Sequence, residues 1–159
     1  MPGLHIPHTH ALAQAFRRRL PVDGIAIGVR AGPDTAQLVY ASDPVSTALD
    51  NLQFTLGEGP CVDAYQHGRP VLVPDLDDPE AVGRWPGFSR DAAAAGAAAV
   101  FAFPMHIGAT SFGTVELHRY SPGTLTGPAL VTAPLLTDDL TRTVLGDRPV
   151  RMPSWASTE

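Results

Sequence analysis

The sequence AAVFAFPMHIG, residues 98–108, most constrains the fold, because its apolar residues occupy consecutive positions rather than alternate ones. Side chains of a strand point in turn to the two faces of a sheet, so a strand of this composition must be covered on both faces. The sequence SFGTVELHRY, residues 111–120, follows after a turn at Gly108 and completes a hairpin. We therefore expect a sheet enclosed between two layers of helix or loop.

The remaining segments predict an antiparallel sheet with helices around it. Alternating apolar residues indicate a second hairpin over 24–31 and 36–42, and a further strand within 69–76. Helices are expected at residues 9–20, 44–51, 60–66, 89–95 and 126–145. Pro134 should bend the last helix or mark its start, and residues 77–88 should form an irregular connection. The order predicts an α+β fold with the terminal helices on one face of the sheet, and short helices and loops over a pocket on the other.

A single domain over residues 9–146 is the simplest organisation for this chain, with flexible segments at 1–8 and 147–159. The formal net charge of -5 argues against a nucleic-acid binder, because neutralising phosphates requires positive charge. A single cysteine cannot form an intramolecular disulfide, the N-terminus does not resemble a secretory signal, and the longest apolar stretch is too short to cross a bilayer. These features predict a cytoplasmic protein without membrane or nucleic-acid partners.

Three segments together resemble one known family. LQFTLGEGPCVDAYQHGRPVLVPDL (52–76), RWPGF (84–88) and AAVFAFPMHIGATSFGTVELHRYSPGTLT (98–126) are similar to GAF domains, nearest to those that precede ANTAR output modules in bacterial signalling proteins. The resemblance extends from about Thr9 to Leu145. It implies a central antiparallel sheet, a ligand pocket on one face, and terminal helices that form a homodimer on the other.

Two features of related GAF domains do not match this sequence. RNA-binding ANTAR helices do not follow the last predicted helix, so we expect any signal to pass to a partner protein. The NKFDE signature of GAF domains that bind cyclic nucleotides is missing, since the chain has no lysine and its single asparagine, Asn51, lies in another context. A cyclic nucleotide is therefore not expected, and the sequence names no other ligand and no cofactor.

Cys61 is the one cysteine, and the turn GEGPC, residues 57–61, places it at the start of a helix. A helix N-terminus stabilises a thiolate, whereas the neighbouring Glu58 and Asp63 disfavour one. GAF-type free methionine sulfoxide reductases carry a cysteine after a similar glycine turn. Their chemistry resolves through a second cysteine, however, and this chain lacks one. We expect Cys61 to line the pocket or the core without catalysis. A thiol-based redox enzyme or sensor is the alternative.

Glu116 and His118 alternate along residues 111–120, so they share one face of the sheet. If that face is the pocket side, Glu116 is the best candidate for a polar ligand contact; otherwise both side chains are hydrated near a sheet edge. Trp85 and Phe88 either cap an apolar ligand or anchor their own loop to the sheet.

Three phenylalanines complete the candidates for the pocket. Phe54, Phe101 and Phe103 are interpreted first as core residues, although one side-chain parity of residues 98–103 must face the pocket side. The predicted ligand-binding residues are Cys61, Phe54, Trp85, Phe88, Phe103 and Glu116. The predicted dimer-interface residues, which follow the terminal helices, are Leu12, Phe16, Leu136 and Leu140.

Three functional hypotheses follow. The first is a non-catalytic sensory or regulatory domain that binds a small molecule or a partner protein, and the second is the redox function at Cys61. The third is a haem- or metal-dependent gas sensor that uses His106, His118 or the N-terminal histidines. Those histidines, His5, His8 and His10, have a spacing that can share a metal ion, but they precede the first predicted helix. Because nothing there fixes ligand geometry, no metal site is predicted.

Overall fold

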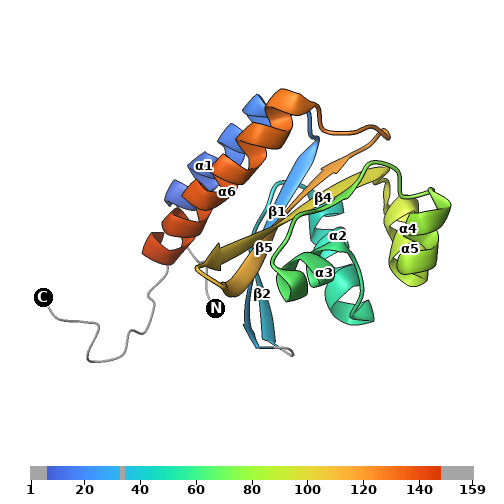
Figure 1. Cartoon of the computed structure of the whole chain (residues 1–159), viewed down its shortest axis with the longest axis horizontal. Coiled ribbons are helices and arrows are strands. Elements are labelled where there is room, and N and C mark those ends of the chain that lie inside the picture. The colour runs from blue at the N-terminus through green and yellow to red at the C-terminus, as the bar shows by residue number, and fades with distance from the viewer. Residues whose placement is uncertain (1–6, 33–34, 148–159) are drawn as a thin grey trace, which may run out of the picture.

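The computed structural model describes residues 7–32 and 35–147 of the 159-residue chain, with strands and short helices between two longer terminal helices (Figure 1). The elements in chain order are α1 (Pro7–Arg19), β1 (Gly24–Gly32), β2 (Thr35–Ala41), α2 (Pro44–Leu56), α3 (Pro60–His67), β3 (Val71–Val73), α4 (Pro79–Arg84), α5 (Pro86–Ala95), β4 (Ala99–Ile107), β5 (Thr110–Arg119) and α6 (Gly127–Asp147). The predicted flexible segments thus lie outside the described residues except for Pro7, His8 and Asp147, which belong to helices.

The five strands form one antiparallel sheet in the order β2-β1-β5-β4-β3, which confirms the predicted α+β class. Strand β5 is therefore central, with β1 and β4 as its hydrogen-bonded neighbours. Val115 of β5 lies opposite Ile27 of β1 and Phe103 of β4. The next residue, Glu116, lies opposite Ala26 and Ala102, and its side chain points to the other face.

One face of the sheet is covered by the two terminal helices, which lie side by side across it as predicted (Figure 1). Apolar residues at alternate strand positions meet apolar residues at helical spacing, so both elements bury a continuous surface. This first core includes Phe16, Ile25, Ile27, Phe101, Phe103, Val115, Leu117, Leu136 and Leu140. Helix α6 is a single element that includes Pro134 and does not begin there.

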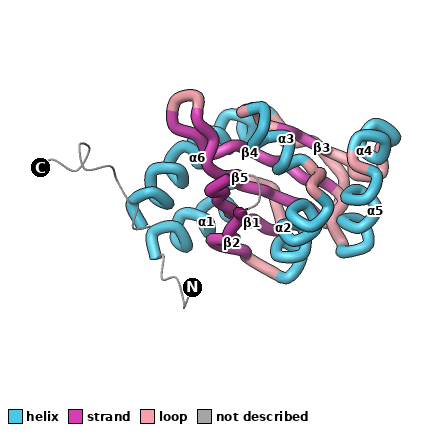
Figure 2. The backbone as a smooth tube through the Cα atoms, turned by 90° about the horizontal axis from the view of Figure 1, so that it is seen from below, coloured by secondary structure: helices cyan, strands magenta, loops and turns pink. Residues whose placement is uncertain are grey.

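The opposite face is covered by α2 and α3, with α4 and α5 beyond them at one end of the sheet (Figure 2). Asp43 caps α2, since its side chain accepts a hydrogen bond from the Ser46 backbone N, and Pro44 occupies the first helical turn. Helix α3 ends at Gly68, which adopts a left-handed conformation. A second core beneath these helices includes Leu49, Val73, Leu76, Trp85, Phe88 and Val100.

The region expected to be an irregular connection is instead largely helical. Helix α4 begins after Asp78, whose side chain accepts from the Glu80 backbone N, and α5 begins at Pro86. Both prolines that suggested a loop occupy first-turn positions, where a missing N–H costs little. Ser89 is therefore not an N-cap; it lies inside α5, and its hydroxyl donates to the Ala81 carbonyl oxygen at 2.9 Å.

Two other helix boundaries differ from the prediction. Helix α1 begins at Pro7, two residues before the expected N-cap Thr9, and Thr9 is a buried residue within the helix. Helix α2 continues to Leu56 rather than ending near Asn51, because Gly57 closes it in a left-handed conformation. The extra turn carries Gln53 over the sheet, which determines the site described next.

Candidate functional site

A cluster of polar side chains lies between the central strand and helices α2 and α3, in a region that is otherwise apolar. Glu116 of β5 is only 3% exposed, and its Oε2 accepts a hydrogen bond of 2.6 Å from Nε2 of Gln53 on α2. The Gln53 Oε1 accepts in turn from the backbone N of Cys61, the second residue of α3, at 2.7 Å. One glutamine side chain thereby joins α2, α3 and β5.

The local sequence explains why this cluster exists. Glu116 sits on a strand with neighbours on both sides, and its two cross-strand neighbours are the small residues Ala26 and Ala102. These alanines leave room above the strand for polar side chains. The turn before α3 makes room as well: Gly59 has φ 142°, and a Cβ at that position would lie 2.5 Å from Gln53 Cγ. The GEGPC turn therefore shapes the seat of the Gln53 side chain.

Burial controls the protonation of this cluster. Burial raises the pKa of Glu116 from 4.5 to about 8, the hydrogen bond from Gln53 opposes that rise, and the nearby Asp50 reinforces it. No positively charged group among the described residues contributes to this pKa. Burial also raises the pKa of the Cys61 thiol well above its ordinary value, and Glu116 raises it further. At neutral pH both groups are therefore mainly protonated.

The hollow that adjoins this cluster is very small. Its volume is about 20 Å³, and its lining includes Arg30, Asp50, Gln53, Phe54, Cys61 and Thr114. A space of this size holds about one water molecule. The expected pocket beneath α2 and α3 is thus occupied by the protein's own side chains, so a larger ligand requires α2 or α3 to move away from the sheet.

A second buried polar group lies at the end of the same face. Nδ1 of His118 is 3.3 Å from Oγ of Ser46, and Nε2 of His118 is 3.9 Å from Oδ1 of Asp43. His118 and Ser46 are each 1% exposed, and a Cβ on Gly24 would lie 2.2 Å from the His118 ring. Serine, histidine and aspartate meet here, but the backbone of Gly24 closes the space that a substrate would need. The group therefore holds the start of α2 against the sheet.

Comparison with known proteins gives a family assignment that agrees with this geometry. The GAF domain family matches residues 9–141. The chain belongs to the GAF domain family. A search of curated proteins gives no match.

Solved structures with the same fold come from several kinds of protein. A domain assigned to a two-component sensor histidine kinase protein from Sinorhizobium meliloti 1021 is similar with a TM-score of 0.69 and 17% identity, over 89% of this chain and 91% of that one. GAF3 from Slr1393 of Synechocystis sp. PCC6803 gives 0.65 and 15% identity, over 87% and 92%. The type II free methionine-R-sulfoxide reductase from Thermoplasma acidophilum gives 0.65 and 13% identity, over 87% and 90%. At these identities the likeness concerns the fold.

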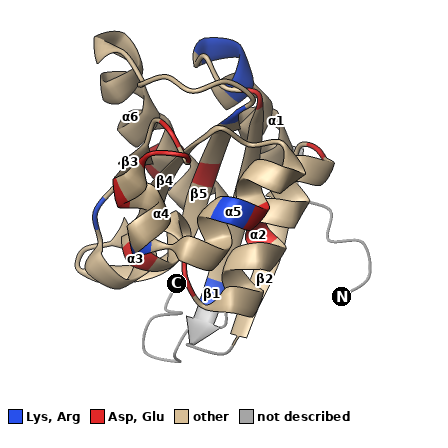
Figure 3. Ribbon diagram, turned by 90° about the vertical axis from the view of Figure 1, so that its right-hand side faces the viewer, with Lys and Arg blue, Asp and Glu red and all other residues tan. Residues whose placement is uncertain are grey.

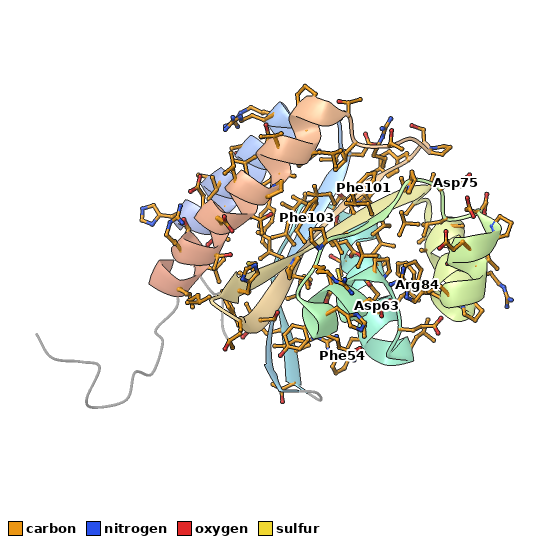
Figure 4. The ribbon with its side chains drawn as sticks, viewed as in Figure 1. Phe54, Asp63, Asp75, Arg84, Phe101 and Phe103 are labelled. Carbon is orange, nitrogen blue, oxygen red and sulfur yellow. The ribbon has the colours of Figure 1, made fainter. Side chains whose placement is uncertain are left out.

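Within this GAF domain, the structure brings some of the predicted ligand-binding residues together and separates others. Cys61 and Glu116 meet in the polar cluster, and Phe54 lies half exposed at the mouth of the small hollow. Phe103 does not belong with them. It lies on the opposite face of the sheet, in the core under α1 and α6, far from Phe54 in Figure 4. Phe101 and Phe103 are two positions apart in β4, so both side chains point to the same face, toward the terminal helices.

Trp85 and Phe88 do not cover the polar cluster. Both side chains are buried in the second core, where they attach α4 and α5 to the sheet. The Nε1 of Trp85 donates to Oδ2 of Asp63 on α3 at 3.2 Å, and the backbone N of Phe88 donates to Oε2 of Glu58 at 3.0 Å. Of the two interpretations, the structure thus favours the aromatic pair as an anchor for its own segment.

The predicted dimer-interface residues face the interior of the domain. Phe16, Leu136 and Leu140 are buried between the terminal helices and the sheet, and Leu12 packs against the same core. The outward face of α6 presents other apolar residues. These are Leu130, Val131 and Leu135, with exposed fractions of 41%, 65% and 61%. The spacing of these residues correctly predicted helices, but the apolar stripe that they form packs against the sheet of the same domain.

Three observations concern other candidate sites. Among the described residues, no three or more histidines, cysteines, aspartates and glutamates are placed to hold a metal ion. His10 packs edge-on against Tyr40, with ring centroids 5.1 Å apart, while His5 lies outside the described part of the chain. None of the described helices combines the length and apolar character needed to span a membrane.

Sequence reasoning missed Gln53, Asp50 and the Asp43–Ser46 pair. Gln53 lies four residues after Leu49, so both point from α2 toward the sheet. A glutamine on the apolar stripe of a helix signals a buried polar partner, and Glu116 on a central strand signals the same need. Pairing these two polar residues, each of which needs a buried hydrogen-bonding partner, would have predicted their contact.

Proposed function

We propose that this GAF domain is a non-catalytic sensory or regulatory module in signal transduction, which binds a small molecule at the polar cluster of Gln53, Cys61 and Glu116. The observation that supports this is the burial of the Glu116 carboxyl group on the central strand, where its side-chain partner is Gln53 and burial raises its pKa to about 8. A protonated carboxyl group both donates and accepts hydrogen bonds, so Glu116 can exchange its bond from Gln53 for bonds to a small polar ligand without leaving a buried polar group unpaired.

Binding at this cluster requires movement, because the hollow accommodates about one water molecule. Helices α2 and α3 cover the cluster, and Gln53 connects them to Glu116. A ligand that replaces Gln53 as the partner of Glu116 favours a state in which α2 or α3 lies farther from the sheet. Because the ligand then binds the open state more tightly than the closed one, its binding shifts the population toward the open state, and this shift carries the signal.

A thermal-denaturation screen tests this proposal. The full chain is screened against small amino acids, amines, carboxylic acids and nucleobases, beside the matched variants Glu116→Gln and Glu80→Gln. We expect at least one compound to raise the melting temperature of the native protein and of Glu80→Gln, with a clearly smaller rise for Glu116→Gln. A set of compounds that stabilises nothing, or that stabilises both variants equally, would remove the cluster as the binding site.

We further propose that the domain acts as a homodimer through the exposed face of α6. The support is the exposure of three large apolar side chains within two turns of α6, Leu130, Val131 and Leu135, since exposed apolar surface often marks an interaction site. Any signal then passes through α1 and α6 to a partner protein.

We place the chain nearest to the GAF domains that precede ANTAR modules, on its GEGPC and RWPGF segments. We infer a cytoplasmic location from its single cysteine.

The alternative redox function has less support. A reductase shares this fold, but a thiol whose pKa is raised by burial and by Glu116 forms little of the thiolate that such chemistry needs. The chain also lacks a second cysteine. We therefore assign no enzymatic activity to Cys61.

A further inference from the structure

A trough runs along the free edge of β3, away from the polar cluster. Two surface hollows of about 200 and 310 Å³ adjoin there and share Leu72 and Arg84 as lining residues. Strand β3 forms one wall, and the end of α4 forms the other. Its floor is partly apolar, with Val73, Ala81 and Trp85 beneath it. We call this surface the edge trough.

The wall formed by β3 is an edge of the sheet. β3 is the last strand of the sheet and pairs only with β4 among the described strands. Alternate N–H and C=O groups of an edge strand point away from its neighbour and are free to pair with another chain. Pro70 and Pro74 bracket the strand and have no N–H to donate, and the Pro74 carbonyl oxygen already accepts from the Gly123 backbone N at 2.9 Å, so the groups on offer are those of Val71–Val73. The free edge therefore suits a short extended segment.

The two ends of the edge trough carry opposite charge, and Figure 3 shows acidic and basic segments on either side of β3. His67 and Arg69 lie before the strand and line one hollow. Asp75, Asp78 and Glu80 lie after it and line the other. This arrangement favours a segment with an acidic residue at one end and a basic residue at the other.

Arg84 separates the two ends without adding free charge to either. Its Nη2 and Nε lie 2.9 and 3.1 Å from Oδ2 of Asp63, and its guanidinium stacks 4.6 Å from the Trp85 ring (Figure 4). These contacts hold Arg84 as a fixed wall opposite β3. Arg84 thereby bounds the edge trough on the side opposite β3 and lines both hollows.

We propose that the edge trough docks an extended peptide segment of a partner protein, which adds to β3 as a short strand. An acidic side chain of the segment lies near Arg69, and a basic side chain lies near Asp75, Asp78 and Glu80. Main-chain hydrogen bonds to β3 provide affinity, and the charged ends select the sequence. This gives the domain a protein-binding surface separate from its small-molecule site.

Short synthetic peptides and NMR spectra of the full chain test the proposal. The probe is acetylated, amidated Glu-Thr-Val-Thr-Lys, and the control has the same sequence with N-methylated amides at alternate positions, which removes the ladder donors. We expect the probe to shift the backbone amide signals of Arg69, Val71–Val73, Asp75 and residues 80–85 in a saturable way. N-methylation should weaken binding by about tenfold or more, because the main-chain bonds provide the affinity.

Charge exchange provides the second arm. Arg69→Glu should weaken binding of the probe and favour Lys-Thr-Val-Thr-Lys instead, while Arg90→Glu, an exposed change on α5, should alter neither. The proposal is overturned if the β3 signals do not move at millimolar probe, or if N-methylation has no effect. It is equally overturned if those signals shift with protein concentration alone, which would identify a second copy as the occupant.

Discussion

The side-chain amide of Gln53 donates a 2.6 Å hydrogen bond to the carboxyl group of Glu116, and it does so across the boundary between α2 and the central strand. Because the backbone N of Cys61 donates to the same glutamine, the position of α3 depends on this pair as well. The pair thus fixes two helices against the sheet through polar contacts, in a region where packing alone would be less specific.

Glu116 should make stability depend on pH in a defined window. Its pKa rises from 4.5 to about 8 on folding, so between these values the folded protein holds a proton that the unfolded chain has released. Stability therefore falls as pH rises through that window, with a contribution of about 1.4 kcal/mol per pH unit. Urea unfolding of the native protein and of Glu116→Gln from pH 5 to 8 measures the difference. Parallel curves for the two proteins would contradict the assignment.

The thiol of Cys61 should react slowly in the folded protein. Each unit by which burial raises its pKa lowers the thiolate fraction about tenfold at a fixed pH below that pKa. The measurement is the rate of reaction with a chromogenic disulfide reagent at pH 7, with the same chain in concentrated urea as the control. Rapid reaction of the folded protein would restore the redox hypothesis. Cys61→Ser should fold normally, because its backbone N bonds Gln53 and a serine hydroxyl can replace the thiol in its contacts with Glu116 and Thr114.

Gly59→Ala should destabilise the domain more than Gly57→Ala. Both glycines have positive φ, but a Cβ on Gly57 meets no atom within 4 Å, whereas a Cβ on Gly59 would lie 2.5 Å from Gln53 Cγ. Backbone strain costs about 1–3 kcal/mol at each position, and only Gly59→Ala also displaces Gln53 from Glu116 and Cys61. Free energies of unfolding in urea provide the comparison. Equal losses would mean that the Gln53 contact adds nothing.

The sequence sufficed for the sheet and for placing Glu116 and His118 on one shared face, because alternation along β5 determines side-chain parity, but it left open whether that face lies under the helices or is hydrated. It did not determine which parity of β4 faces the terminal helices, so Phe103 was placed on the wrong face. Pro79 and Pro86 suggested a loop, because the spacing did not reveal that each proline follows the N-cap residue of a helix, Asp78 or Trp85. The volume left beneath α2 and α3 depends on how all the side chains pack, which spacing along the chain does not contain.

Val131→Arg should separate the proposed dimer. Val131 is 65% exposed in the middle of the apolar face of α6, and a charge there would have to be buried at the interface without a partner. Ile107→Arg is the matched control, since Ile107 is 59% exposed at the end of β4. Sedimentation over a range of concentrations should show a dimer for the native protein and the control, and a monomer for Val131→Arg. A native protein that stays monomeric throughout would remove the dimer proposal.

Asp43→Asn should lower the pKa of His118 while it preserves the cap of α2. Burial lowers the pKa of His118 below 6.5, while Asp43 and, to a smaller extent, Asp23 raise it. Asparagine caps helices about as well as aspartate, so the substitution removes the charge and retains the acceptor for the Ser46 backbone N. NMR titration of the His118 ring proton should give a lower midpoint for Asp43→Asn, a smaller decrease for Asp23→Asn, and an increase for Arg17→Gln. If the titration midpoint of His118 is the same in all three variants, burial alone determines its pKa, and Asp43 serves only as a cap.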